Sequence, residues 1–141
     1  MSKTLVLGFD DSPSANAALR RTIALAGETG ADVAVVFGFY ITPWGGTGEG
    51  TIREAVADVG SRAVANAAAA LEAAGVSCTS HLVEQKPAEA LIHVAQELEA
   101  ETIVVGTVGE HPITGSFLGS VVLRLVQRSP VPVLVVPTSE G

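Results

Sequence analysis

Cysteine and long apolar runs are both scarce in this chain. The one cysteine, Cys78, has no partner for an internal disulfide, which suits the reducing cytoplasm. No apolar run approaches the roughly 20 residues that a membrane-spanning helix needs. The first residues, MSKTLVLGFDD, also lack the apolar core and cleavage site of a signal peptide. We therefore expect a cytoplasmic protein that has no membrane partner.

Basic residues are also few. The chain has 8 Lys and Arg residues against 15 Asp and Glu residues, and its formal net charge is −7. Non-specific binding to nucleic acid or to an anionic membrane needs a basic surface, so we expect no nucleic-acid partner. An anionic ligand would feel no long-range attraction and would depend on local dipoles and hydrogen bonds.

Aromatic residues make up only 4% of the chain, although 48% of its residues are hydrophobic. Val, Ala and Leu must therefore fill the core, as they do in sheets that are covered on both faces. Apolar runs predict strands, and amphipathic segments between them predict helices. The strands are expected at residues 4–9, 32–40, 76–83, 102–105 and 131–136, and the helices at residues 13–29, 54–74, 87–100 and 120–128. This alternation predicts an α/β fold with a single parallel sheet, in one domain spanning residues 1–141.

Two of these strands have the marks of sheet edges, and one connection is long. Residues 76–83 alternate and carry polar side chains, while Pro132 in the last run has no N–H for a ladder hydrogen bond. Residues 42–50, TPWGGTGEG, predict a loop. Its Trp44 is expected to cover apolar surface rather than to stack on a ligand.

Residues 103–122, IVVGTVGEHPITGSFLGSVV, predict a strand, a Gly-rich loop and the start of a helix. Gly106 at the strand end would let the backbone approach a sugar or phosphate, and Gly119-Ser120 would offer N–H donors and the positive end of a helix dipole. The loop is neither a Walker A motif nor a dinucleotide fingerprint. TLVLG at residues 4–8 and TIVVG at residues 102–106 are near copies. If these two strands are neighbours, the crevice between them is the switch point where such sheets bind ligands.

The glycine spacing points to a known family. Gly106-x2-Gly109-x9-Gly119-Ser120 fits G-x2-G-x9-G-S/T, the ATP-binding signature of the universal stress protein family. The flanking VVGTVG and GSVVLRLVQRSPVPVLVVP, and a first turn that contains Asp10 and a following serine, resemble that family as well. The resemblance covers nearly the whole chain and is weakest at residues 42–60.

This resemblance implies an adenine nucleotide alpha-hydrolase-like sheet of order 3-2-1-4-5, with ATP or AMP between strands 1 and 4 and with Mg²⁺ as a companion of ATP. It implies a homodimer through the last strand, from Val131 to Val136. It also implies a set of nucleotide contacts, from the base through the ribose to the phosphates: Gly8, Asp10, Gly38, Gly106, Thr107, Gly109, Gly119, Ser120 and Val121.

One residue departs from the family pattern. Glu110 lies where ATP-binding members often carry Arg or Lys, and only a protonated His111 could offset its charge. We therefore expect weaker triphosphate binding, which makes AMP, or a different ligand, more plausible. The leading hypothesis is a nucleotide-dependent stress-response protein. The alternatives are a dimeric interaction module with a vestigial or differently liganded pocket, and a slow ATP hydrolase.

The sequence commits no residue to catalysis or to a metal. No nucleophile has an adjacent base, and Asp10 and Asp11 alone do not make a metal site. Asp11 is expected to favour the start of the first helix electrostatically, and His81 and His93 are given no chemistry.

Overall fold

A computed structural model describes residues 3–41, 49–108 and 119–138. Strands and helices alternate along this part of the chain. The strands are β1 (Thr4–Gly8), β2 (Asp32–Gly38), β3 (Cys78–Val83), β4 (Thr102–Gly106) and β5 (Val133–Val136). The helices are α1 (Pro13–Thr29), α2 (Glu49–Ala73), α3 (Pro87–Glu97) and α4 (Ser120–Arg128).

The five strands form one parallel sheet in the order β3-β2-β1-β4-β5. The predicted order 3-2-1-4-5 is confirmed. In the register of the central strands, Leu5 lies beside Val33 of β2 and beside Thr102 of β4. The near-copies TLVLG and TIVVG are therefore neighbouring strands.

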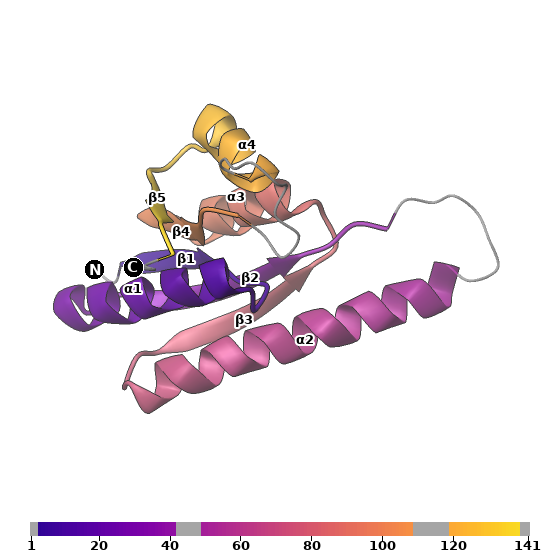
Figure 1. Cartoon of the computed structure of the whole chain (residues 1–141). Coiled ribbons are helices and arrows are strands. Elements are labelled where there is room, and N and C mark those ends of the chain that lie inside the picture. Colours follow the sequence, from indigo (N-terminus) through magenta and orange to yellow (C-terminus); the bar gives the residue numbers. More distant parts are fainter. Residues whose placement is uncertain (1–2, 42–48, 109–118, 139–141) are drawn as a thin grey trace.

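Helices cover both faces of the sheet, as predicted. Figure 1 shows α1 and α2 on one side and α3 and α4 on the other. Adjacent residues of β1 belong to different cores, because successive side chains of a strand point to opposite faces. Leu7 packs with α1 and α2, Val6 packs with α3 and α4, and both are fully buried. This two-sided burial explains why the central strands are continuous apolar runs.

The first helix begins and ends where the sequence predicts. Ser12 is the N-cap, and its hydroxyl accepts a hydrogen bond from the Ala15 N–H at 3.1 Å. Pro13 occupies the first turn. Gly30 ends the helix with φ of 77°, a left-handed conformation that favours glycine.

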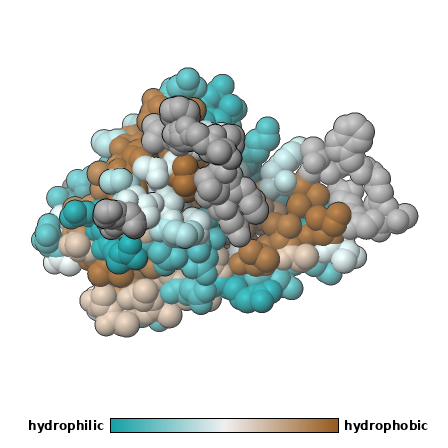
Figure 2. Space-filling view, in the orientation of Figure 1, coloured by the Kyte–Doolittle hydropathy of each residue, from teal (hydrophilic) through white to brown (hydrophobic). Residues whose placement is uncertain are grey.

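The second helix is longer than predicted. It begins at Glu49 rather than at residue 54, so the last two residues of the predicted loop, 49 and 50, belong to α2. Gly60 of α2 packs tightly against Phe37 of β2. The apolar side chains of Ile52 and Val59, which precede Gly60 in the helix, are 53% and 51% exposed. Figure 1 shows α2 extending beyond the strands, and Figure 2 shows apolar surface where β2 ends and α2 begins. Trp44 lies outside the described residues.

Both predicted edge strands lie at the edges of the sheet. Three of the six residues of β3 are exposed and the other three are half-buried, and β5 is half-buried along its length. Pro132 precedes β5, so the strand begins two residues later than predicted, although the Pro132 carbonyl still accepts a hydrogen bond from the Ile103 N–H at 3.0 Å. α3 also ends earlier than predicted, at Glu97. Within the described ranges, no helix is long and apolar enough to cross a membrane.

Candidate functional site

The carboxyl ends of β1 and β4 lie side by side, at the end of the sheet where the parallel strands finish. Leu7 of β1 pairs with Val104 of β4, and the chain leaves the two strands for α1 and α4, which cover opposite faces. This is the topology of a switch point, where the connections diverge and leave a crevice above the strand ends. The predicted switch point between these two strands is therefore present in the fold, and its use as a ligand site stays a prediction.

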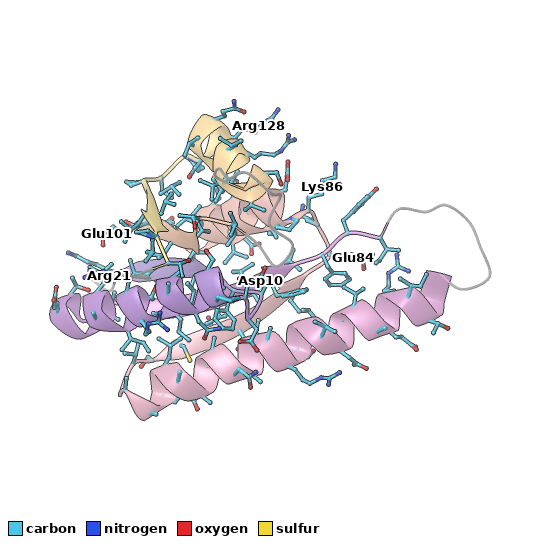
Figure 3. All side chains as sticks on the ribbon, in the orientation of Figure 1. Asp10, Arg21, Glu84, Lys86, Glu101 and Arg128 are labelled. Carbon is cyan, nitrogen blue, oxygen red and sulfur yellow. The ribbon has the colours of Figure 1, made fainter. Side chains whose placement is uncertain are left out.

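The turn after β1 lies at this switch point. The Ser12 N–H donates a hydrogen bond to Asp10 Oδ1 at 3.1 Å, which fixes the carboxylate over the start of α1. Asp10 is half-buried, and Figure 3 shows it where β1 gives way to α1. One Asp10 oxygen is thus used by the turn, and the rigid turn holds the side chain at the strand end.

Asp11 has a larger structural role than the sequence suggests. Its φ is 65°, which is uncommon for a residue other than glycine. Its carboxylate accepts a hydrogen bond from the Asn16 amide at 3.1 Å and another from the Asn66 amide at 3.0 Å. It therefore joins the first turn to both α1 and α2. Asp is one of the few residues that tolerate a left-handed conformation. This preference is the feature of the sequence from which the structural role of Asp11 could have been predicted.

Ser14 connects the two strand ends, and sequence reasoning missed it. Its hydroxyl accepts a hydrogen bond from the Val108 N–H at 3.2 Å and lies 3.5 Å from the Thr107 hydroxyl. The side chain is 2% exposed. A buried serine in the first turn of α1 thereby fixes the turn that follows β4, more than ninety residues later in the chain.

Gly106 is needed for this contact. A Cβ at Gly106 would collide with the hydroxyl and the backbone carbonyl of Ser14. The missing side chain therefore allows α1 to pack closely on β4. The predicted approach of the Gly106 backbone to a ligand stays a prediction.

Gly8 and Gly38 similarly permit close packing of α3. A Cβ at Gly38 would lie 2.7 Å from Ala90 Cβ and 2.9 Å from Pro87 Cα, and a Cβ at Gly8 would lie 3.1 Å from Leu91 Cδ1. Gly38 is on β2, which lies next to β1 and is separated from β4 by β1. These glycines bring the start of α3 down onto the strand ends.

The start of α4 is tied directly to the end of β4. The Gly119 N–H donates a hydrogen bond to the Thr107 carbonyl at 2.7 Å, and Gly119 is the N-cap of α4 with an extended backbone. The N-cap has no side chain that accepts from the first turn. The first backbone N–H groups of a helix have no acceptor within the helix, and in α4 these include the N–H groups of Ser120 and Val121, which makes them candidates for binding an anion.

An ion pair joins the two helices on this side of the sheet. Arg124 Nε of α4 lies 2.7 Å from Glu89 Oε2 in the first turn of α3. The hydrogen bond from Arg124 lowers the pKa of Glu89 by favouring its charged form. Near the start of α3, the Lys86 ammonium lies 5.8 Å from the centre of the Tyr40 ring.

The structure brings most of the predicted site residues to the carboxyl end of the sheet. Gly8 ends β1 and Asp10 follows it, Gly106 ends β4 and Thr107 follows it, and α4 begins beside them. Gly109 lies outside the described residues, as do Glu110 and His111. In the ranges that are described, no group of three or more His, Cys, Asp or Glu side chains could hold a metal ion.

A hollow of about 300 Å³ lies elsewhere, at the opposite end of the strands. Its lining residues include Leu5, Thr102 and Val133, which belong to the starts of β1, β4 and β5, and Leu25 from α1. It is mainly apolar and contains none of the predicted site residues. In open parallel sheets, ligands bind at the carboxyl ends of the strands, at the switch point, and this hollow lies at the other end.

Comparison with known proteins assigns the family. The model of the universal stress protein family matches residues 1–137. The chain belongs to the universal stress protein family. A universal stress protein of Thermus aquaticus is 35% identical over 137 residues, which cover 96% of this chain and 99% of the relative. The predicted family membership is thus confirmed along nearly the whole chain.

Solved structures of universal stress proteins share the fold and include nucleotide complexes. A universal stress protein in complex with cAMP is 29% identical with a TM-score of 0.73, and the match covers 98% of each chain. A family protein of Arabidopsis thaliana with AMP bound is 11% identical with a TM-score of 0.73, and the match covers 97% of this chain and 92% of that chain. The second likeness concerns the fold alone.

Proposed function

We propose that this universal stress protein binds an adenine nucleotide in the crevice between β1 and β4. The observation that carries the proposal is the arrangement of three elements: two adjacent strand ends, and the start of α4, which the Gly119–Thr107 hydrogen bond holds beside β4. The nucleotide complexes of two proteins with this fold support the choice of an adenine ligand. The chain is proposed to act as one domain over residues 1–141.

The proposed contacts follow the crevice from β2 to α4. Gly8, Asp10 and Gly38 would meet the base and ribose, with the carboxylate of Asp10 accepting from the sugar or the base. Gly106 and Thr107 would meet the ribose, and Gly109 the turn of the phosphate chain. The N–H groups of Ser120 and Val121, with Gly119 before them, would bind phosphate at the positive end of the α4 dipole.

ATP and AMP are both candidates for the resident ligand. Mg²⁺ would accompany ATP through the phosphate oxygens and water rather than through a protein cage. We propose that the occupied and empty states differ in partner binding or assembly, as part of a cytoplasmic stress response. Any hydrolysis of the bound nucleotide would be slow.

A homodimer through the last strand completes the proposal. β5 is an edge strand, and the backbone groups on its outer side face away from β4. An apolar edge strand can pair with its counterpart in a second copy of the chain. Residues 131–136 would then form the centre of a two-fold interface.

Two measurements test nucleotide binding. The purified protein is denatured and its released small molecules are identified by mass spectrometry, and the empty protein is titrated with ATP, AMP and cAMP by calorimetry. We expect recovery of an adenine nucleotide or binding of at least one of the three. The absence of both would overturn the proposal.

A variant locates the binding. Gly119→Glu places a carboxylate at the N-cap of α4, where it would repel phosphate, and should weaken binding about tenfold or more. Gly27→Glu makes the same change of charge on an exposed turn of α1 with open space around it, and should leave affinity unchanged. Equal losses in the two variants would mean that phosphate does not bind at α4.

A further inference from the structure

The ion pair between α3 and α4 is a single-point contact. It joins Arg124 Nε to Glu89 Oε2 at 2.7 Å, and both side chains are partly exposed, at 45% and 34%. Within the part of the chain that the structure describes, the buried Glu89 Oε1 accepts no hydrogen bond. The pair therefore lacks the two parallel hydrogen bonds of the strongest Arg–carboxylate contacts. A guanidinium has five N–H donors, and this bond uses one of them.

Arg124 is well placed to reach the start of its own helix. It follows Ser120 by four residues, so the two side chains lie on the same face of α4, about 6 Å apart along the helix axis. Side chains of an α-helix lean toward the N-terminus, and a long arginine can extend in that direction. The end of α4 that is proposed to bind phosphate is therefore within the range of this side chain.

Arg124 is also the first cation after the candidate loop. Residues 103–123 contain no Lys or Arg, and the chain as a whole carries a formal charge of −7. Backbone N–H groups can hold one phosphate, but each further phosphate adds negative charge that needs a counter-charge. Arginine is suited to this task because its planar fork matches phosphate oxygens.

We propose that Arg124 exchanges between Glu89 and the outer phosphates of the bound nucleotide, so that this pair sets the preference between ATP and AMP. Glu89 is the internal competitor: it holds the guanidinium when the outer phosphates are absent. Arg124 provides the counter-charge that residues 103–123 lack. This inference rests on the proposed nucleotide site.

The test compares variants that break the same pair from opposite ends. Calorimetric titrations of ATP, ADP and AMP are made with the wild-type protein, Arg124→Gln and Glu89→Gln. Arg124→Gln should weaken ATP binding about tenfold and change AMP binding less than about twofold. Glu89→Gln frees the guanidinium and should tighten ATP binding about threefold, again with little effect on AMP. Effects of opposite sign are the decisive result, because a purely structural pair would lose affinity in both variants.

A second ion pair provides the matched control. Arg53 Nη2 and Glu84 Oε2 are 2.8 Å apart, with similar exposure, at the start of α2. Glu84→Gln should leave both affinities unchanged. Equal effects of Arg124→Gln on ATP and AMP, or no effect, would overturn the proposal while leaving the nucleotide site intact. A wild-type protein that binds none of the three nucleotides would overturn the site and this inference together.

Discussion

The carboxylate of Asp11 accepts a hydrogen bond from the side-chain amide of Asn66, fifty-five residues later in the chain, at 3.0 Å. This contact joins the turn after β1 to the middle of α2. Because the other oxygen of Asp11 binds Asn16, a single side chain fixes the first wall of the candidate site to two helices. The conformation of Asp11, with φ of 65°, directs the carboxylate to both amides.

Replacement of Asp11 should reveal both of its roles. Asp11→Ala removes two hydrogen bonds and leaves a residue with a Cβ in the left-handed region, so we expect a loss of about 1–3 kcal/mol in the free energy of unfolding. Asp11→Asn keeps a residue that tolerates this conformation and should lose less. Urea unfolding of the two variants measures the difference. Equal losses would show that the conformation of residue 11 contributes nothing.

Substitution of Gly106 should destabilise the fold by overpacking. Gly106→Ala forces a methyl group into Ser14, and the expected loss is about 1–3 kcal/mol. Ser14→Ala should not rescue it, since the Ser14 backbone carbonyl is in the way as well. Gly27→Ala, at an open helical position, should instead stabilise by about 0.5–1 kcal/mol. Thermal unfolding checks all three, and a stable Gly106→Ala protein would contradict the packing described for this strand end.

The sequence predicted the layers and the order of the strands better than the purposes of individual residues. Two-sided burial makes the central strands continuous apolar runs, and a serine followed by proline reliably begins a helix, so these features are local. The sheet order came from the family resemblance, and the predicted place of the site came both from that resemblance and from the near-copies TLVLG and TIVVG. Gly106 was predicted as a position where the backbone approaches a ligand, and that contact stays a prediction, whereas the close packing of Ser14 against Gly106 was not predicted. Whether a missing Cβ faces a ligand or a helix depends on the packing of α1, which no local pattern contains.

Contacts between segments that are far apart in the sequence were the least predictable part of the site. In one of them the Ser14 hydroxyl of α1 accepts from the Val108 backbone N–H after β4, and in the other the side chains of Glu89 and Arg124 pair. Both depend on how the helices are rotated and placed. A sequence without such geometry shows only a serine, a glutamate and an arginine on separate segments. The early start of α2 was also missed, because Gly50 is a weak helix former and the glycines before it suggested a longer loop.

The stability contributed by Glu89 should depend on pH. Arg124 lowers the pKa of Glu89 in the folded state, so the contribution is present above the unfolded pKa of about 4.3 and is lost as pH falls through the lower folded value. Because the pair is partly exposed, it should be worth less than about 1 kcal/mol. Unfolding of wild type and Glu89→Gln at neutral and acidic pH measures this. A stability difference that persists after full protonation would contradict an electrostatic origin.

The thiol of Cys78 should react slowly with thiol reagents. Partial burial raises its pKa, and the charge of Glu72 raises it further, so less thiolate is present at neutral pH than in free cysteine. We expect slower alkylation than that of a cysteine-containing peptide at pH 7.5, and faster alkylation as pH rises. Glu72→Gln should increase the rate modestly. Peptide-like reactivity in the native protein would contradict this environment.

The most direct test of the central claim is a map of backbone amide chemical shifts during titration with AMP. Binding between β1 and β4 predicts the largest changes at Gly8, Thr107, Ser120 and Val121. It predicts no comparable change at Leu25 and the other residues of the 300 Å³ hollow at the opposite end of the strands. Shifts concentrated at that hollow, with the start of α4 unaffected, would contradict the account.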